Sequence, residues 1–409
     1  MTYILLITLY YYPEPISHPH ELAKTLTNSG LQVKVITSYP NYPNGQIYDS
    51  YKHRNRIEEN VEKVNIFRVS HFIDRTKSSV KRIMSFISFS ASVILYCSKR
   101  MEKPDIIWTY QVGLPGLILS KLWEIPYIHE VQDLWPDWGV SARIGIKSFL
   151  NKILETQEKI IYNHAAAIVT ITPGFKKILS SRVKNPEKIV VIPNWANDNF
   201  LVETTRPTDD LSKEISSDFF NVLYVGNIGT AQGLIYLVQA AFNLKDHSDI
   251  QITIIGDGVE KIVLEDRTIQ LGLPNIKFLG SLPQEIAAQY MKIADVLFIH
   301  LKDDPVYEIT IPSKTYGYLA AKRPILAAAR GELANLINEN KVGLVCPPED
   351  SQAIANAIIK LKNLPREELD KMGLAGYNLV TNNFTREILG KKYVDLFEEI
   401  LEKRKGKKI

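Results

Sequence analysis

Short apolar runs rich in Ile and Val alternate with longer helical patterns along the chain, and this alternation begins twice. Such an order predicts βαβ units and a mostly parallel sheet. The first series of expected strands comprises Tyr3–Leu9, Gln32–Ile36, Ile106–Tyr110, Tyr127–Val131, Ala167–Ile171 and Ile189–Ile192. The second comprises Val222–Val225, Gln251–Ile255, Ile276–Leu279, Val296–Ile299, Ile325–Ala328 and Gly343–Val345. The sequence therefore predicts an α/β protein with two doubly wound domains.

A polar stretch, Phe200–Asp218, separates the two series and predicts a linker. We expect an N-terminal Rossmann-like domain at residues 1–199 and a C-terminal Rossmann-like domain at residues 200–384. Three helical segments are expected between Pro348 and Arg404. Ligands bind outside the carboxyl ends of the strands in doubly wound sheets, so two such domains facing a central cleft would suit an enzyme with two substrates.

The composition is that of an ordinary globular protein, with 45% hydrophobic and 23% charged residues in a chain of 409. A net charge of +4 is too small to indicate a surface for nucleic acid. Cys97 and Cys346 lie far apart, so neither a disulfide framework nor a zinc site is predicted. Thr2–Leu9 lacks the basic flank and cleavage site of a signal peptide. These features predict a cytoplasmic protein that binds no nucleic acid.

The segment Lys77–Lys103 carries basic residues at both ends of an apolar run. Its longest uncharged part, Ile83–Cys97, holds four serines and falls short of the roughly 20 apolar residues that a spanning helix needs. No transmembrane helix is expected. Two interpretations stay open: a helix that makes a peripheral membrane contact on anionic lipid, and a core helix with charged ends.

Glycine clusters follow consecutive strands of the second series, at Gly226–Gly233, Gly256–Gly258 and Gly280. Glycines let the backbone approach a phosphate closely, and amide N–H groups at a helix start meet its charge. Each cluster alone also fits a tight turn that binds nothing. Their recurrence along one edge of the sheet favours a nucleotide-binding edge.

The sequence Pro312-Ser313-Lys314 predicts the start of a helix, with Ser313 as its cap. Lys314 would then lie in the first turn, where a cation opposes the helix dipole. A purely structural helix start would favour an acidic residue there. Lys314 is therefore interpreted as a partner for an external anion, with a solvated surface lysine as the alternative.

Charged and aromatic residues gather around the end of the strand Tyr127–Val131. His129, Glu130, Asp133 and Trp135 are expected together in one turn. His129 would hydrogen-bond a sugar hydroxyl or transfer a proton, and Asp133 would accept a hydrogen bond from a hydroxyl. The alternative for His129 and Trp135 is an ordinary place in the core.

The loop Tyr10–His20 follows the first strand and is rich in aromatic residues and histidines, which suits a carbohydrate or a phosphorylated ligand. His18 and His20 flank Pro19 and have no further ligand at a metal-binding spacing. We therefore expect no metal site. The sequence contains no Walker A motif and no nucleophile elbow.

Seven segments of this chain, in their order and spacing, resemble glycosyltransferase family 4, in particular its bacterial branch of colanic-acid, O-antigen and capsule glycosyltransferases. They are YYYPEP, ELAKTLTNSGLQVKVIT, VQDLWPDW, VIPNW, LYVGNIGTAQGL, IGDGVEK and IPSKTYGYLAAKRPIL. The resemblance implies the GT-B fold, with the donor in the C-terminal domain and a final helix, residues 385–409, that crosses back to the N-terminal domain. It also implies a retaining enzyme that needs no metal and no cofactor.

The resemblance also implies roles for individual residues. Those that would approach or hold the donor are Gly226, Asn227, Gly229, Gly256, Ser313 and Lys314. His129 and Asp133 would lie beside the reacting sugar and, with Lys314, are the expected catalytic residues.

Two departures from the family pattern concern charge. Asn227 and Gln232 stand where the family often has Arg and Lys. The family's paired glutamates would align with Ile309 and Gly317, so neither is present, and the adjacent Glu308 is the nearest substitute. More of the phosphate charge would then depend on Lys314.

The expected reaction is transfer of a sugar from a nucleotide-sugar donor, a UDP-sugar, to a hydroxyl of a lipid-linked saccharide acceptor in cell-surface polysaccharide synthesis. Two alternatives stay open. One is a nucleotide-sugar epimerase of the same fold, which needs no acceptor. The other is an inactive sugar-nucleotide-binding protein, for which the missing glutamate pair is the main argument.

Overall fold

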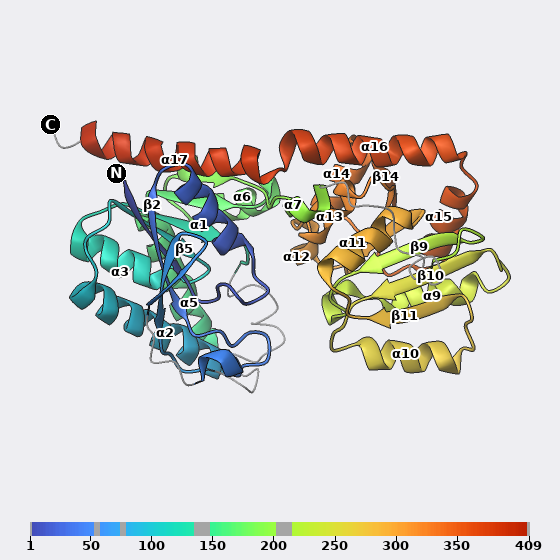
Figure 1. The fold of residues 1–409 in the computed structure, drawn as a ribbon, viewed down its shortest axis with the longest axis horizontal. Coiled ribbons are helices and arrows are strands. Elements are labelled where there is room, and N and C mark those ends of the chain that lie inside the picture. Colours follow the sequence, from blue (N-terminus) through green and yellow to red (C-terminus); the bar gives the residue numbers. More distant parts are fainter. Residues whose placement is uncertain (1, 53–57, 74–78, 135–147, 202–214, 407–409) are drawn as a thin grey trace. The chain divides into compact units, whose positions relative to one another are not determined.

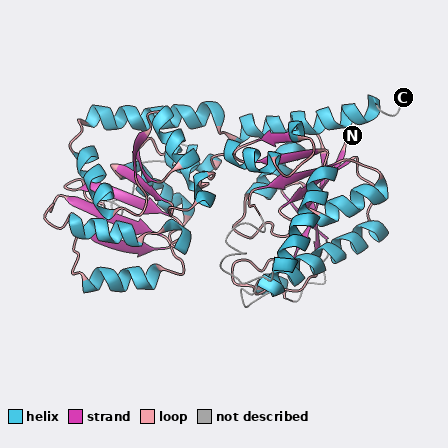
Figure 2. Cartoon of the chain, turned by 180° about the vertical axis from the view of Figure 1, so that it is seen from behind, coloured by secondary structure: helices cyan, strands magenta, loops and turns pink. Residues whose placement is uncertain are grey.

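The structure, a computed structural model, describes residues 2–52, 58–73, 79–134, 148–201 and 215–406. The chain forms two compact units, Met1–Pro193 with Leu389–Ile409 (unit 1) and Asn194–Ile388 (unit 2). In each unit, helices cover both faces of a central sheet (Figures 1 and 2). Most of the stretch expected as a linker, residues 202–214, lies outside the described residues.

Unit 1 is built on an eight-stranded sheet in the order β3-β4-β2-β1-β5-β6-β7-β8. Its strands are β1 (Tyr3–Thr8), β2 (Gln32–Ser38), β3 (Glu58–Val61), β4 (Val64–Val69), β5 (Ile106–Tyr110), β6 (Tyr127–Val131), β7 (Ala167–Thr170) and β8 (Ile189–Val191). All neighbours pair in parallel except β3 with β4. The six strands expected here are confirmed, with ends that agree to within two residues.

The β3–β4 hairpin was not predicted from the sequence. Its turn residues, Glu62 and Lys63, have φ angles of 49° and 70°, a conformation that hairpin turns normally give to Gly or Asn. Contacts from helix α1 (His18–Asn28) hold this turn, because His20 Nε2 and Lys24 Nζ lie 2.9 and 2.7 Å from Glu62 Oε2. A tertiary contact thus takes the place of a turn motif.

Helices cover both faces of the unit 1 sheet. They are α1, α2 (Ser79–Arg100), α3 (Leu114–Trp123), α5 (Ser148–His164), α6 (Pro173–Ser180) and, from Leu389 onward, α17 (Arg386–Gly406); short helical turns are η1 (Asp49–Tyr51) and η2 (Pro186–Lys188). Helix α2 contacts β2, β4 and α3, and α3 in turn contacts β5, β6 and α5. In the described part of the chain, α2 is the one helix long and apolar enough to cross a membrane, by length and composition alone.

Unit 2 has a six-stranded parallel sheet in the order β11-β10-β9-β12-β13-β14. Its strands are β9 (Phe220–Val225), β10 (Ile250–Ile255), β11 (Ile276–Gly280), β12 (Val296–His300), β13 (Ile325–Ala328) and β14 (Gly343–Cys346). Its helices are α7 (Asp198–Leu201), η3 (Thr230–Gln232), α9 (Ile235–Asn243), α10 (Lys261–Gln270), α11 (Gln284–Ile293), α12 (Pro305–Glu308), α13 (Lys314–Ala320), α14 (Gly331–Glu339), α15 (Ser351–Lys362) and α16 (Arg366–Asn383). The six expected strands and the three helices beyond Pro348 are confirmed.

Alternate residues of each unit 2 strand enter different cores. Leu223 and Leu297 join a cluster with residues of α11, α13 and α14, whereas Val222 and Val296 join a second cluster with residues of α9 and α15. This alternation follows from the two-residue repeat of a strand. A parallel sheet buried on both faces leaves its strand ends as the place where polar groups can meet a ligand.

Candidate active site

The turn that follows β9 in unit 2 approaches the neighbouring turn very closely. A Cβ atom on Gly256 would lie 1.9 Å from the Gly226 carbonyl oxygen, and one on Gly258 would lie 2.3 Å from the Ile228 carbonyl oxygen. The φ angles of Gly226 and Gly256 are 138° and 146°, in a region that side chains rarely adopt. Gly256 therefore holds the Gly226 turn in place through backbone packing.

Most amide groups of this turn already have partners. Gly226 N–H donates to Ile255 O, and Ile228 N–H donates to Asp257 O. The Gln232 side chain folds back, so that Gly229 N–H donates to Gln232 Oε1 at 3.2 Å. The Asn227 amide donates to no acceptor in the described residues. Of the backbone amides at Gly226, Asn227 and Gly229, only that of Asn227 can donate a hydrogen bond to a phosphate without breaking one that it already makes.

Tyr318 fixes helix α13 against the end of β9. Its hydroxyl accepts a hydrogen bond from Val225 N–H at 2.7 Å and donates to Val225 O at 3.1 Å. Lys314 lies four residues earlier, on the same face of the helix. Its Nζ atom donates to the Tyr224 hydroxyl at 2.6 Å and lies 3.8 Å from the Tyr224 ring centroid. The lysine is thereby aimed at the turn.

Lys314 reaches the glycine turn itself. A Cβ atom on Gly226 would lie 2.6 Å from Lys314 Nζ, so a side chain at residue 226 would displace the ammonium group. Burial lowers the pKa of Lys314 to about 7. Lys314 is thus held beside the turn, and near neutral pH its side chain is only partly protonated. A bound anion would restore that charge.

One structural expectation for this helix is wrong. Ser313 lies just before α13 with φ −57° and ψ −30°, and its side chain makes no capping hydrogen bond. An N-cap residue normally has an extended backbone that turns its oxygen toward the free amides, and Ser313 is already helical. Its hydroxyl is exposed instead.

Gly317 stands where the resemblance implies a glutamate, and the structure fills that space with another side chain. A Cβ atom on Gly317 would lie 3.1 Å from Phe200 Cε2 of α7. Glu308 ends α12 and is exposed, with its carbonyl oxygen packed against Gly331. Glu308 therefore belongs to α12 and not to α13.

His300 was missed by the sequence reasoning, since a histidine that ends an apolar strand carries no motif. Its Nε2 accepts the Glu349 amide hydrogen at 3.0 Å, which leaves the imidazole proton on Nδ1. The ring stacks on Tyr236 and lies directly under Gly233, where a Cβ atom would be 2.8 Å from His300 Cε1. Burial lowers the pKa of His300 to about 4, so the ring supports the turn as a neutral group.

In unit 1, the expected cluster in a single turn is wrong. His129 and Glu130 lie inside strand β6 and not after it, so their side chains point to opposite faces of the sheet. His129 contacts Thr109 and Tyr162, whereas Glu130 contacts Trp108 and Tyr393. Trp135 lies outside the described residues.

The hydrogen bonds of His129 indicate its tautomer. Thr109 Oγ1 donates to Ile128 O, so it accepts from His129 Nδ1 at 2.8 Å. Nε2 is then left as an acceptor. Burial lowers the pKa of His129 to about 4, although the neighbouring Glu130 opposes this shift. A neutral histidine of this kind accepts a hydroxyl hydrogen bond and is a weak proton carrier at neutral pH.

Glu130 is a buried carboxylate surrounded by donors. His18 Nε2 lies 2.7 Å from Oε1, Gln132 Nε2 donates to Oε1 at 2.8 Å, and the Tyr393 hydroxyl of α17 donates to Oε2 at 2.8 Å. Burial alone would raise the pKa of Glu130, but His18 and these hydrogen bonds outweigh it and lower the pKa. This network attaches α17 to unit 1.

The loop Tyr10–His20 is organised by a second buried carboxylate. Glu14 accepts hydrogen bonds from the amides of Tyr11, Asn41 and Tyr42 at 2.7 to 2.8 Å. His20 turns inward to Tyr11 and Glu62. His18 and His20 are therefore directed to different carboxylates, and no group of three or more His, Cys, Asp or Glu in the described residues could hold a metal ion.

Asp133 lies just beyond β6 and accepts a hydrogen bond from Gln111 Nε2 at 3.2 Å. Although Asp133 keeps exposed surface, the protein around its carboxyl group raises its pKa, and the Gln111 hydrogen bond opposes this shift. Gln111 has a φ angle of 62° at the end of β5. Such strained residues cluster at functional sites, yet nothing in the sequence marked Gln111.

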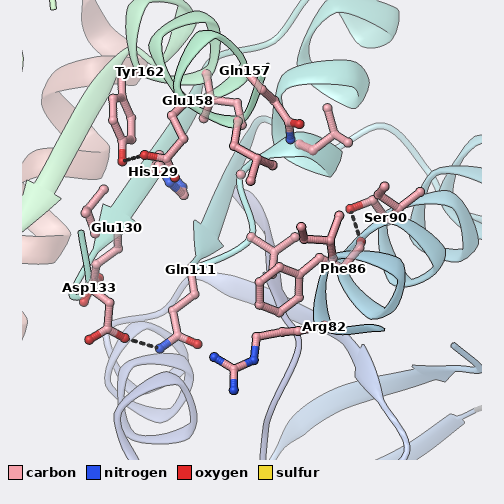
Figure 3. Close-up of a pocket in the computed structure, with 18 of the residues that line it drawn as sticks. Arg82, Phe86, Ser90, Gln111, His129, Glu130, Asp133, Gln157, Glu158 and Tyr162 are labelled. Carbon is pink, nitrogen blue, oxygen red and sulfur yellow. Dashed lines mark hydrogen bonds between the residues drawn. The ribbon is translucent and has the colours of Figure 1, made fainter. Parts of the chain in front are cut away.

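His129 and Asp133 border one pocket of about 570 Å³ within unit 1. Figure 3 shows Gln111 and Asp133 on one side of it, His129, Glu158 and Tyr162 on another, and Phe86 and Ser90 of α2 opposite. Burial raises the pKa of Glu158 to about 7, although a 2.7 Å hydrogen bond from Tyr162 opposes this shift. Titratable groups with displaced pKa values in an apolar pocket are typical of a ligand site.

Two family models match successive parts of this chain. The Glycosyl transferase 4-like domain matches residues 16–195, and Glycosyl transferases group 1 matches residues 206–379. The chain belongs to glycosyltransferase family 4. Among its relatives is the putative colanic acid biosynthesis glycosyl transferase WcaI of Escherichia coli, 26% identical over 90% of this chain and 93% of that protein. The probable glycosyltransferase WbjE of Pseudomonas aeruginosa is also 26% identical, over 67% and 68% of the two chains.

Solved structures confirm the GT-B fold of this glycosyltransferase. Sucrose-phosphate synthase from Thermosynechococcus elongatus matches with a TM-score of 0.76 and 20% identity over 98% of this chain and all of that one. Anabaena Alr3699/HepE, solved in complex with UDP, matches with a TM-score of 0.72 and 15% identity over the same shares. These matches confirm the predicted fold, which consists of two Rossmann-like units.

Proposed function

We propose that this glycosyltransferase moves a sugar from a UDP-sugar to a hydroxyl of a lipid-linked saccharide in cell-surface polysaccharide synthesis, with retention at the anomeric carbon. The names of its relatives support the pathway class, since they include a putative colanic acid biosynthesis glycosyl transferase and an O-antigen chain mannosyltransferase. HepE, of the same fold, was solved with UDP and with UDP-glucose.

The placement of Lys314 is the observation that carries this proposal. Its ammonium group is directed by Tyr224 to the Gly226 turn, where the Asn227 amide has no acceptor in the described residues. One cation and one amide at the carboxyl end of a central strand suit a diphosphate. Asn227 and Gln232 bring no charge, so Lys314 is the main cation that this turn offers to the donor.

Departure of the diphosphate increases its negative charge as the glycosidic bond breaks. Lys314 therefore stabilises the transition state more than the bound donor, which is how a charged contact raises the rate of the chemical step. With retention and without a covalent intermediate on the protein, the acceptor hydroxyl attacks the anomeric carbon on the same face from which the leaving group departs, and the departing phosphate oxygen takes the acceptor proton.

The groups of unit 1 serve the acceptor in this proposal. Nε2 of neutral His129 accepts a hydrogen bond from a sugar hydroxyl, and Asp133, positioned by Gln111, accepts another. Their task is to orient the attacking hydroxyl, because orientation alone contributes several kcal/mol to a two-substrate reaction.

Incubation of the purified protein with UDP-sugars tests this function, with and without an extract of lipid-linked saccharides. Transfer requires the acceptor and releases UDP. A sugar that changes configuration without any acceptor would indicate an epimerase instead. Thermal stabilisation by a UDP-sugar without turnover on any acceptor would indicate an inactive binding protein.

A further inference from the structure

The pocket of unit 1 is more apolar than hydroxyl recognition requires. Its polar groups lie at the ends of β5 and β6 and also on α2 and α5, but most of the wall that these two helices form is aliphatic and aromatic. These wall residues are Ile83, Phe86, Ile87, Ile153, Leu154 and Ile161. A saccharide alone would leave this wall without a partner, so the pocket fits a ligand with one polar and one apolar end.

Helix α2 has three distinct faces. Phe89, Val93 and Cys97 are fully buried against the unit. A second face, with Ile83, Phe86 and Ser90, lines the pocket. The third face is apolar but open to solvent. Val80, Met84, Ile87 and Leu95 are 50 to 58% exposed, and their spacing places them along one side of the helix.

Ile87 belongs to both the pocket wall and the exposed stripe. The apolar surface is therefore continuous from inside the pocket to the outside of α2. Ile153 of α5, which also lines the pocket, is likewise exposed. An exposed apolar surface that continues out of a pocket suits a chain longer than the pocket itself.

Arg82 lies at the polar side of the same pocket. Figure 3 shows its guanidinium group extending from α2 toward Gln111, next to Phe86. No carboxylate of the described chain forms an ion pair with Arg82. A guanidinium that is exposed and has no ion pair among the described residues, beside an apolar wall, suits a phosphate that is joined to an apolar chain.

From this arrangement we infer that the pocket between α2 and α5 holds the first part of an apolar chain bearing a phosphate, with the phosphate on Arg82 and the chain against Phe86 and Ile87. The identification of this chain as the lipid of the acceptor rests on the proposed function. The attached saccharide then lies at Gln111, Asp133 and His129, and the rest of the chain follows the exposed stripe of α2.

Titration of the full chain with farnesyl phosphate tests this inference by calorimetry, with dodecyl phosphate, farnesol and inorganic phosphate as parallel ligands. Both chain phosphates should bind, farnesol about tenfold more weakly because it lacks the charged contact, and inorganic phosphate without saturation. Tighter binding of farnesyl phosphate than of dodecyl phosphate would indicate an isoprenoid chain, and the reverse a linear one.

Two exposed positions make variants that should still fold. Arg82→Gln and Ile87→Glu should each weaken farnesyl phosphate binding about tenfold. Ile269→Glu, on α10 of unit 2, changes an isoleucine that is 77% exposed and should leave binding unchanged. All three should keep the thermal stabilisation that a UDP-sugar gives to the wild type.

Absence of farnesyl phosphate binding, or equal binding by the wild type and both unit 1 variants, would overturn the pocket assignment. If UDP-sugar stabilisation persists in that case, the proposed function stands. Farnesyl phosphate binding that responds to Arg82 and Ile87, in a protein that no UDP-sugar stabilises, would support the pocket and overturn the proposed function instead.

Discussion

The candidate loops of both units follow the carboxyl ends of central parallel strands, but they are held in different ways and carry different chemistry. In unit 2, backbone packs on backbone at Gly226 and Gly256, and one lysine supplies the charge. In unit 1, side chains on strands and helices form the site, and acceptors such as Asp133 and the guanidinium group of Arg82 surround an apolar pocket. Under the proposed function, the same architecture binds the donor diphosphate in unit 2 and the hydroxyl groups of the acceptor in unit 1.

The contrast teaches where substitution should be tolerated. A turn built from backbone contacts leaves no room for a methyl group, whereas a pocket lined by side chains can adjust. Loss of charge should be severe in unit 2, because Asn227 and Gln232 replace the cations that the family pattern often places beside Lys314. The following changes test this comparison.

Lys314→Met should lower the rate of sugar transfer by about 100-fold to 1000-fold, because a charged contact to the departing diphosphate is lost. The rate constant at saturating donor measures this effect. Lys261→Met, on α10, removes a lysine that pairs with Glu265 and should leave the rate unchanged. A Lys314→Met enzyme that keeps a third or more of the activity would contradict the role of Lys314.

Gly226→Ala should weaken UDP-sugar binding by about tenfold or more, since the new methyl group would lie 2.6 Å from Lys314 Nζ. Gly30→Ala is the matched control, because Gly30 also has a positive φ of 84° but open space around its Cβ position. Both variants should lose similar stability from backbone strain. Equal donor affinity in the two variants would show that crowding at the turn does not matter.

Glu158→Gln should change the pH dependence of stability in unit 1. Burial raises the folded-state pKa of Glu158 to about 7, so the wild type loses stability as pH rises from about 4.3, the ordinary value, to about 7. The glutamine cannot ionise, and the variant should gain about 1 to 2 kcal/mol relative to the wild type near pH 8.

Denaturant unfolding at two pH values measures this difference. Glu155→Gln, one turn earlier on α5 and exposed, should show no such gain. If the difference in free energy of unfolding between the wild type and Glu158→Gln is the same at both pH values, the Glu158 carboxyl group is not held in the protonated form.

UDP-sugar affinity should fall by a few-fold as pH rises through about 7, the pKa to which burial lowers Lys314. The protonated lysine binds the diphosphate more strongly, so binding above this pH takes up a proton. Calorimetry in two buffers of different ionisation enthalpy measures that proton. Lys314→Met should bind with no such uptake, and persistence of the uptake in the variant would assign it to another group.

The strands of both sheets could be predicted because each is a short run of Ile and Val, and burial on both faces selects such residues. The β3–β4 hairpin could not, since Glu62 and Lys63 hold their turn through His20 and Lys24, which are distant in sequence. The proximity of Lys314 to the Gly226 turn follows from the order of strands. Its aim at Gly226 follows from Tyr318 and Tyr224, whose contacts no motif predicts.

The site in unit 1 was only partly predictable. His129 and Asp133 stood out by residue type, but their grouping with Glu130 was wrong, because a turn was expected where the strand continues and alternation separates the side chains. Gln111, Glu158 and Arg82 come from other elements, and only packing of α2 and α5 over the strand ends brings them together.

The sequence by itself determined the α/β class, the two series of strands and the residue types at the strand ends, because these depend on local patterns of burial and turn formation. The tertiary structure alone decided which amides of the glycine turn are free, where Lys314 points, which face of β6 carries His129, and that an apolar pocket continues onto the outside of α2. These features depend on contacts between segments far apart in the chain, and local sequence carries no record of such contacts.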